Sequence, residues 1–187
     1  MQLAIIGYHG VICETPDGKA PPPRAWRPIR GSLEAIARMH RAGWRVIVTA
    51  NQPEIADGSI DPDTLIRQHD AMRRRVAENG GVIDAVFYCP HSPADGCSCH
   101  MPSPGLLHDI SNRLHVSLDG VPLIGDSLAH VQAARSAGAM PVLVKTGKGF
   151  GTVSLPELDP AVPVFNDLYS AVNHLLDDTG TPGEKPS

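Results

Sequence analysis

The sequence has no excess of positive charge, no long apolar run and few cysteines. Its 187 residues carry 16 lysines and arginines against 20 acidic residues, a formal net charge of -4. We therefore expect neither nucleic acid nor a membrane surface as a partner. No apolar run approaches the roughly 20 residues that span a bilayer, and the start "MQLAIIG" lacks the basic region and cleavage site of a secretory signal. We expect a cytoplasmic protein.

The four cysteines favour metal binding or buried thiols over disulfides in such a protein. Three of them stand with a histidine in "CPHSPADGCSC", as Cys89, His91, Cys97 and Cys99. Three thiolates and one imidazole are the ligand set of a closed, tetrahedral structural zinc site. We predict zinc as a structural cofactor that leaves no open position for an activated water. The isolated Cys13 is expected in the core.

Short β-branched or apolar runs alternate with helical patterns along the chain. Strands are expected at 3–6, 44–50, 84–89, 121–125 and 140–145, with a short apolar segment at 162–165. Helices are expected from a cap at Ser32 to Gly43, and at 62–79, 105–114, 127–137 and 168–177. This alternation predicts an α/β fold with a doubly wound, mainly parallel sheet. We expect one domain over residues 1–177, a proline-rich loop at 14–28 and a flexible C-terminal tail at 178–187.

Ligands of such folds bind beyond the carboxyl ends of the strands. That edge is expected to gather residues 7–10, 50–52, 89–101, 125–127 and 146–149. At the end of the first strand, where reactive groups are normally displayed, the sequence has Gly7, Tyr8 and His9.

Five segments together resemble the haloacid dehalogenase (HAD) superfamily. They are "GVI", "TANQPEIADG", "FYCPHSPADGCSCHMPSPGLL", "IGDSLAHVQAARSAG" and "VLVKTGKG". The resemblance covers roughly residues 2 to 150 and is closest to the D-glycero-D-manno-heptose 1,7-bisphosphate and histidinol-phosphate phosphatases. It implies a HAD-like fold with a zinc-stapled loop after the third strand.

The resemblance also implies which functional groups are missing. These phosphatases use an Asp-x-Asp-Gly motif, in which one aspartate attacks phosphorus and the other acts as general acid and base. The sequence has Gly7 and His9 at those two positions. Ala50 stands in place of the phosphate-binding hydroxyl, and His100 and Met101 stand in place of the Arg-Lys pair. His130 replaces the second magnesium carboxylate, and Asp57 replaces an arginine. Asp126 keeps the first magnesium carboxylate of its motif.

These departures predict a protein that has lost phosphatase activity. With Asp126 nearly alone, magnesium binding is expected to be compromised. The chain would then act as a binding or partner protein, with a small phosphorylated sugar or a protein as its ligand. Asn51, Gln52 and Lys148 are the candidate substrate-binding residues.

Three alternatives stay open at this point. The first is a phosphatase with weak or rerouted activity on a phosphorylated sugar or a similar metabolite. The second is a phosphoryl group carried by His9. The third is a second site for a softer divalent metal, formed by His9, His100 and His130 with Asp126. The simplest reading of these histidines is that they fill an inactive pocket.

Overall fold

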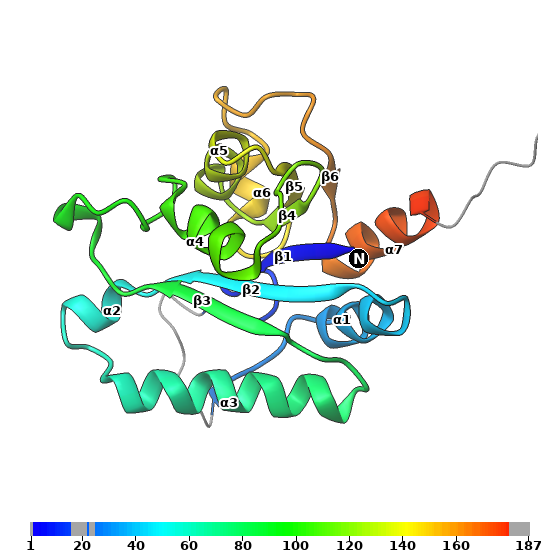
Figure 1. Cartoon of the computed structure of the whole chain (residues 1–187). Helices are drawn as coiled ribbons and strands as arrows, with labels where there is room; N and C mark the ends of the chain where they lie inside the picture. The colour runs from blue at the N-terminus through cyan, green and yellow to red at the C-terminus, as the bar shows by residue number, and fades with distance from the viewer. Residues whose placement is uncertain (1, 16–21, 23–24, 180–187) are drawn as a thin grey trace, which may run out of the picture.

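The computed structural model describes residues 2–15, 22 and 25–179. Six parallel strands form one sheet in the order β3-β2-β1-β4-β5-β6 (Figure 1). They are β1 (Leu3–Gly7), β2 (Arg45–Asn51), β3 (Ala85–Cys89), β4 (Pro122–Gly125), β5 (Met140–Val144) and β6 (Val164–Phe165). The predicted doubly wound, parallel architecture is confirmed.

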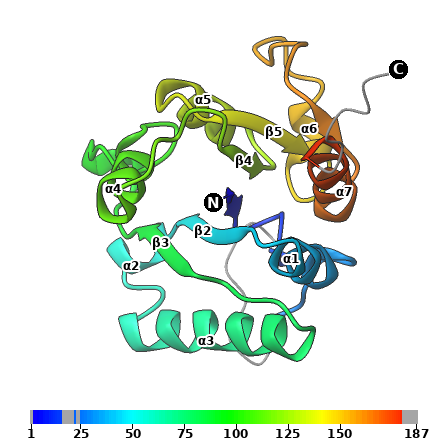
Figure 2. The same cartoon turned by 45° about the vertical axis from the view of Figure 1, so that its right-hand side comes forward.

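Helices cover both faces of the sheet. They are α1 (Ser32–Arg41), α2 (Pro53–Ala56), α3 (Pro62–Glu78), α4 (Gly105–Leu114), α5 (Leu128–Ser136), α6 (Gly149–Thr152) and α7 (Leu168–Thr179). One apolar cluster joins the sheet to α1, α3 and α7, and another joins it to α4 and α5. Figures 1 and 2 show α3 and α4 on opposite sides of the β2–β3 layer. Within the described residues, no helix is both long and apolar enough to cross a bilayer.

Strand patterns explain the two-sided core. Val46, Val48 and Ala50 belong to the first cluster, whereas Ile47 belongs to the second. Alternating side chains of one strand point to opposite faces, and both faces here are covered. The strands therefore read as continuous apolar runs, as is usual for buried parallel strands.

Several boundaries differ from the sequence prediction. Helix α1 is capped by Gly31 in the left-handed region, whereas the Ser32 hydroxyl donates to the carbonyl of Ile12 at 2.8 Å. The predicted serine cap is therefore wrong. Asp61 caps α3 as expected, accepting from the Thr64 amide at 2.7 Å. The short α2 and α6 were not predicted.

Two predicted boundaries fall near the ends of the described ranges. Helix α7 continues to Thr179, two residues beyond its expected end at 177. The rest of that tail, 180–187, and most of the central part of the proline-rich loop, 16–21 and 23–24, lie outside the described residues.

The strand order places a crevice between β1 and β4. The chain winds from β1 through β2 to β3 and then returns to the other side of β1 as β4. Ligands of doubly wound folds bind at this switch point, beyond the carboxyl ends of the strands. Because β1 ends at Gly7 and β4 at Gly125, residues 8–10 and 126–127 meet there.

Candidate functional site

The turn after β1 packs directly against Asp126. The amide of Tyr8 donates to the Thr49 carbonyl at 2.8 Å, which continues the pairing of β1 with β2. Gly10 has a φ of 72°, and a Cβ at this position would collide with the Asp126 carboxylate. The positive φ and the lack of space for a Cβ both require glycine at this position. The backbone that would display catalytic groups is thus intact.

The imidazole of His130 occupies the space beside Gly7. A Cβ on Gly7 would lie 2.9 Å from Nε2 of His130 and 3.3 Å from Cγ2 of Val11. The other ring nitrogen, Nδ1, lies 2.8 Å from Oγ of Ser127 and 3.5 Å from Oδ1 of Asp126. Ser127 therefore holds the ring at Nδ1. The Nε2 end of the ring occupies the space that a side chain on Gly7 would need.

His130 also depends on a second glycine. A Cβ on Gly125 would collide with Cβ and Cγ of His130. Burial holds the pKa of His130 below its usual range, although the Asp126 carboxylate opposes that shift. The imidazole is therefore neutral at pH 7.

His9 is held from behind by Gln52. Nε2 of Gln52 lies 2.9 Å from Nε2 of His9, so the two side chains hold each other by a hydrogen bond. Burial lowers the pKa of His9 to about 4, and the hydrogen bond with Gln52 opposes part of that shift. His9 is a neutral, fixed imidazole at pH 7.

A cavity of about 390 Å³ opens over these groups. Its walls bring together parts of the chain that sequence reasoning placed at this edge: His9, Ala50, Asn51, His100, Met101, Asp126, His130 and Lys148. Gly7, Gln52 and Asp57 are not among the lining residues. Glu54 and Thr49 also line the cavity and were not predicted; the only signal for Glu54 was its place just after β2, in "NQPEIADG".

Asn51 clamps the backbone of Met101. Its Nδ2 donates to the Met101 carbonyl and its Oδ1 accepts from the Met101 amide, both at 3.1 Å. Met101 is buried in the apolar cluster beneath α4 and α5. Gln52 is fully buried, and Lys148 is exposed at the cavity rim, with its backbone amide donating to Oδ2 of Asp126 at 2.9 Å. The substrate-binding roles of these residues stay predictions.

The predicted zinc ligands converge on one point. The ligand atoms of Cys89, His91, Cys97 and Cys99 all lie within 4.8 Å of one another. Sγ of Cys97 is 3.6 Å from the sulfurs of both other cysteines, and Nδ1 of His91 is 3.6 and 3.2 Å from Cys89 and Cys99. Tetrahedral zinc with its usual bond lengths would have edges of about 3.8 Å between sulfurs and about 3.6 Å from sulfur to nitrogen. The cluster therefore fits a metal ion of this kind.

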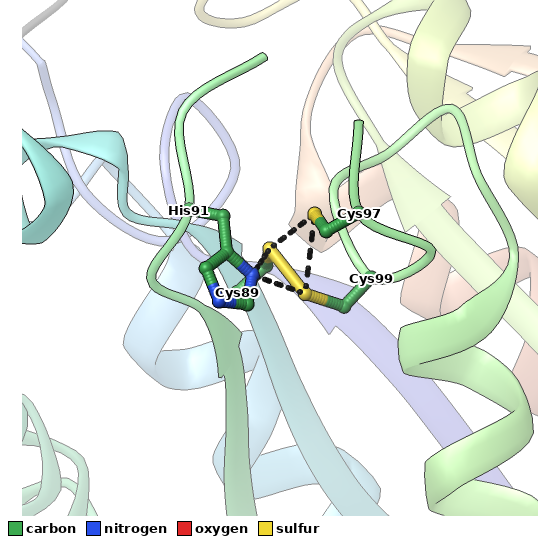
Figure 3. Close-up of side chains that lie close together, drawn as sticks. All are labelled: Cys89, His91, Cys97 and Cys99. Atoms are coloured by element: carbon green, nitrogen blue, oxygen red, sulfur yellow. Dashed lines mark hydrogen bonds between the residues drawn. A yellow bond between two sulfur atoms is a disulfide. The ribbon is translucent and has the colours of Figure 1, made fainter. Parts of the chain in front are cut away.

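The cysteines of this cluster are not all free thiols, contrary to what the sequence analysis expected. Cys89 and Cys99 are joined as a disulfide, and Cys97 keeps a free thiol (Figure 3). The reason is geometric, because thiols that converge on one tetrahedral centre are also close enough to pair. Metal binding and the disulfide are alternative states of the same cluster, since a metal ligand must be a thiolate.

The loop is shaped so that its ligands can meet. Ser92 and Asp95 form a capping box around a short 3-10 turn (Pro93–Asp95), and Gly96 reverses the chain with a φ of 62°. Gly105 then donates its amide to the Ser98 carbonyl at 2.8 Å, where a Cβ would collide with that carbonyl. The loop folds back onto itself and returns to the cavity at Met101.

The structure does not support a second metal site of histidines. His9, His100 and His130 line one cavity, but their ring nitrogens have separate partners, which are Gln52, the His91 carbonyl and Ser127. Among the described residues, the zinc-loop cluster is the one group of three or more potential ligand atoms that converges. His130, rather than His9, stands at the position of the missing nucleophile.

The residues present do not fit magnesium. This ion requires an octahedron of hard oxygen ligands, with one or two carboxylates among them. Asp126 is the single carboxylate at the turn; its Oδ2 accepts from the Lys148 amide, and His130 lies against its Oδ1. Gly7 adds no oxygen ligand from its side chain, and the neighbouring space holds a neutral imidazole.

Comparison with known proteins places this fold and site in a family. A HAD-hydrolase-like family model matches residues 98–171. The D-glycero-beta-D-manno-heptose-1,7-bisphosphate 7-phosphatase of Bordetella bronchiseptica is 43% identical over 95% of this chain and 99% of its own length. The enzyme of the same name from Pseudomonas aeruginosa is 42% identical over 93% and 97%.

Solved structures agree with this relationship. The Bordetella bronchiseptica D,D-heptose 1,7-bisphosphate phosphatase, complexed with magnesium and phosphate, superposes with a TM-score of 0.92 at 43% identity, covering 95% of this chain and 99% of that one. The Burkholderia thailandensis phosphatase of the same name gives 0.75 at 34% identity, covering 94% and 99%. The chain is a HAD-like protein. Within that superfamily it belongs to the group of the heptose 1,7-bisphosphate phosphatases.

Proposed function

We propose that this chain is a member of the heptose bisphosphate phosphatase group that binds a ligand or partner without hydrolysing it. One observation carries the proposal: His130 fills the space beside Gly7, where the group's nucleophile would stand. Covalent phosphoryl transfer needs an attacking group and neutralisation of phosphate charge. The described cavity offers no carboxylate at Gly7 and one exposed ammonium, that of Lys148.

The remaining roles follow from the resemblance and stay predictions. A small phosphorylated sugar is one candidate ligand because the relatives are named for a heptose bisphosphate, and a protein is the other candidate partner. A cytoplasmic location is proposed with them. We also propose that the Cys89, His91, Cys97 and Cys99 cluster holds zinc, which would fix the loop and take no part in catalysis because all four positions are used.

The first test is turnover. The purified chain should release no phosphate from heptose 1,7-bisphosphate or from an aryl phosphate in the presence of magnesium. Steady turnover that co-purifies with the chain would contradict the proposal. Loss of that turnover in His9→Ala or His130→Gln would identify the imidazole responsible.

The second test is restoration of the missing groups. Five changes together should return magnesium binding and some phosphatase activity: Gly7→Asp, His9→Asp, Ala50→Thr, Met101→Lys and His130→Asp. The structure adds the last of these, because an aspartate at residue 7 meets the His130 imidazole. The four-residue variant that keeps His130 is the matched control and should stay inactive, since groups that act as a unit are strongly non-additive.

One observation favours a second function. Nδ1 of His130 is held by Ser127 beside Asp126, and Nε2 is directed at Gly7. A neutral imidazole held in this way is a possible proton acceptor. A weak, metal-independent phosphatase is therefore the alternative, and turnover that persists in a chelator but not in His130→Gln would favour it.

A further inference from the structure

The cavity carries more negative than positive charge. Two carboxylates line it, those of Glu54 and Asp126, against the single ammonium of Lys148, which is exposed. A phosphate ester entering this cavity would meet like charge from both carboxylates.

Four buried polar atoms of the lining have no hydrogen-bond partner among the described residues: Oε2 of Glu54, Oγ1 of Thr49, the Tyr8 hydroxyl and Nδ1 of His9. Thr49 is fully buried. Buried polar atoms are nearly always hydrogen-bonded, and an unpaired one is costly. The Thr49 hydroxyl can donate or accept, but the carboxylate oxygen of Glu54 only accepts. A ligand that brings an N–H donor would satisfy Oε2 of Glu54, whereas a phosphate oxygen would not.

Three core side chains form a firmly placed part of the wall. Tyr8, Ala50 and Met101 are buried side chains of the core. Met101 is fixed by the two hydrogen bonds of Asn51. The volume of about 390 Å³ lies in the usual range for small-molecule sites.

We propose that this cavity binds a small organic cation with a primary ammonium group, without magnesium. The ammonium would be recognised by the carboxylates of Glu54 and Asp126, and hydroxyl donors of the ligand by Thr49. The inference rests on the proposed non-hydrolysing function and names the class of its ligand. It differs from the phosphorylated sugar that the resemblance suggests.

Three hexoses of one carbon skeleton and different charge test this proposal: glucosamine, glucose and glucose 6-phosphate. Their affinities are measured by calorimetry or NMR titration in magnesium-free buffer at pH 7. A charge-assisted hydrogen bond gives about a tenfold to hundredfold gain, so glucosamine should bind at least about tenfold more tightly than glucose. Glucose 6-phosphate should bind most weakly.

Variants assign the preference to the cavity. Glu54→Gln keeps the shape of the side chain and removes its charge, and it should abolish most of the preference for glucosamine over glucose. Glu157→Gln makes the same chemical change at an exposed residue outside the lining and should leave the preference unchanged. Lys148→Gln removes the competing ammonium but keeps the backbone bond to Asp126, and it should strengthen glucosamine binding.

Three results would overturn the inference. They are tighter binding of glucose 6-phosphate than of glucosamine, an unchanged preference in Glu54→Gln, and no saturable binding of any of the three hexoses. Failure of the proposed function is a separate result, because it would appear as phosphate release in the turnover assay. Tight binding of glucose 6-phosphate without hydrolysis would contradict the proposed cationic ligand but agree with the proposed non-hydrolysing function.

Discussion

The contact between Gly7 and His130 makes a prediction about stability. Gly7 ends β1 in extended backbone, so alanine is permitted there by its conformation. The added Cβ, however, would lie 2.9 Å from Nε2 of His130, which is closer than real Cβ contacts come. The imidazole has little freedom to retreat, because Ser127 holds its other nitrogen at 2.8 Å and Gly125 lies against its Cβ.

The expected cost follows from overpacking of a rigid core. Inserting a methyl group into a well-packed site costs about 1–3 kcal/mol. Gly7→Ala should therefore lower the free energy of unfolding by this amount, or lower the melting temperature by about 2–4 °C per kcal/mol for a chain of this size. In a His130→Ala background the space is open, and Gly7→Ala should be neutral or stabilising by up to about 1 kcal/mol, because it reduces the entropy of the unfolded chain.

Urea denaturation of the four proteins of this double-mutant cycle measures the coupling. The contact with Val11 at 3.3 Å is present in both backgrounds and cancels. We expect a coupling energy of about 1–3 kcal/mol between residues 7 and 130. An equal cost of Gly7→Ala with and without the imidazole would refute the claim that His130 occupies the site of the missing side chain.

Three further predictions concern the metal loop, acid stability and the Met101 clamp. Protein purified without added zinc should carry one zinc per chain by elemental analysis, and Cys97→Ser should lower stability; folded protein without metal would contradict this. Stability should fall as the pH drops from about 6.5 toward about 4. His69 is one of two buried histidines with a pKa near 4, so the unfolded chain binds more protons in this range. His69→Gln should reduce the slope of stability against pH. An unchanged denaturation midpoint between neutral and acid pH in the parent chain would contradict the lowered pKa values of His69 and His9. Asn51→Ala should cost about 1–3 kcal/mol by removing both bonds to Met101, clearly more than Asn79→Ala, which removes one exposed bond.

Sequence patterns predicted the strands and the longer helices, because apolar runs and helical periods mark each of them. The apolar runs of β1, β2, β4 and β5 are buried on both faces, which leaves little doubt about a parallel sheet covered by helices. The short α2 and α6 were missed because four residues carry no helical period. The cap at Ser32 was wrong because a tertiary bond to Ile12 competes for the hydroxyl, and local sequence does not contain that partner.

The candidate site was predictable where the ligands are close in the chain. Cys89 to Cys99 form one loop, so their spacing alone brings them together. His130 and Gly7 are distant in sequence, and the packing of one against the other depends on the pairing of β1 with β4. Thr49 and Ala50 are neighbours in β2, so strand alternation points their side chains to opposite faces, yet both line the cavity. A cavity wall at the end of a sheet can include neighbours from both faces of a strand, which alternation does not reveal.

The geometry at the end of β1 explains why the departures from the family pattern belong together. An aspartate at residue 7 and the present imidazole at residue 130 exclude each other, since the first Cβ already meets the ring. The imidazole in turn requires Gly125, and it takes the side of Asp126 that faces away from the Lys148 amide. Restoring one carboxylate would therefore create a clash before it created a metal ligand. A pocket of this kind can regain phosphoryl chemistry only if His130 and Gly7 are replaced together.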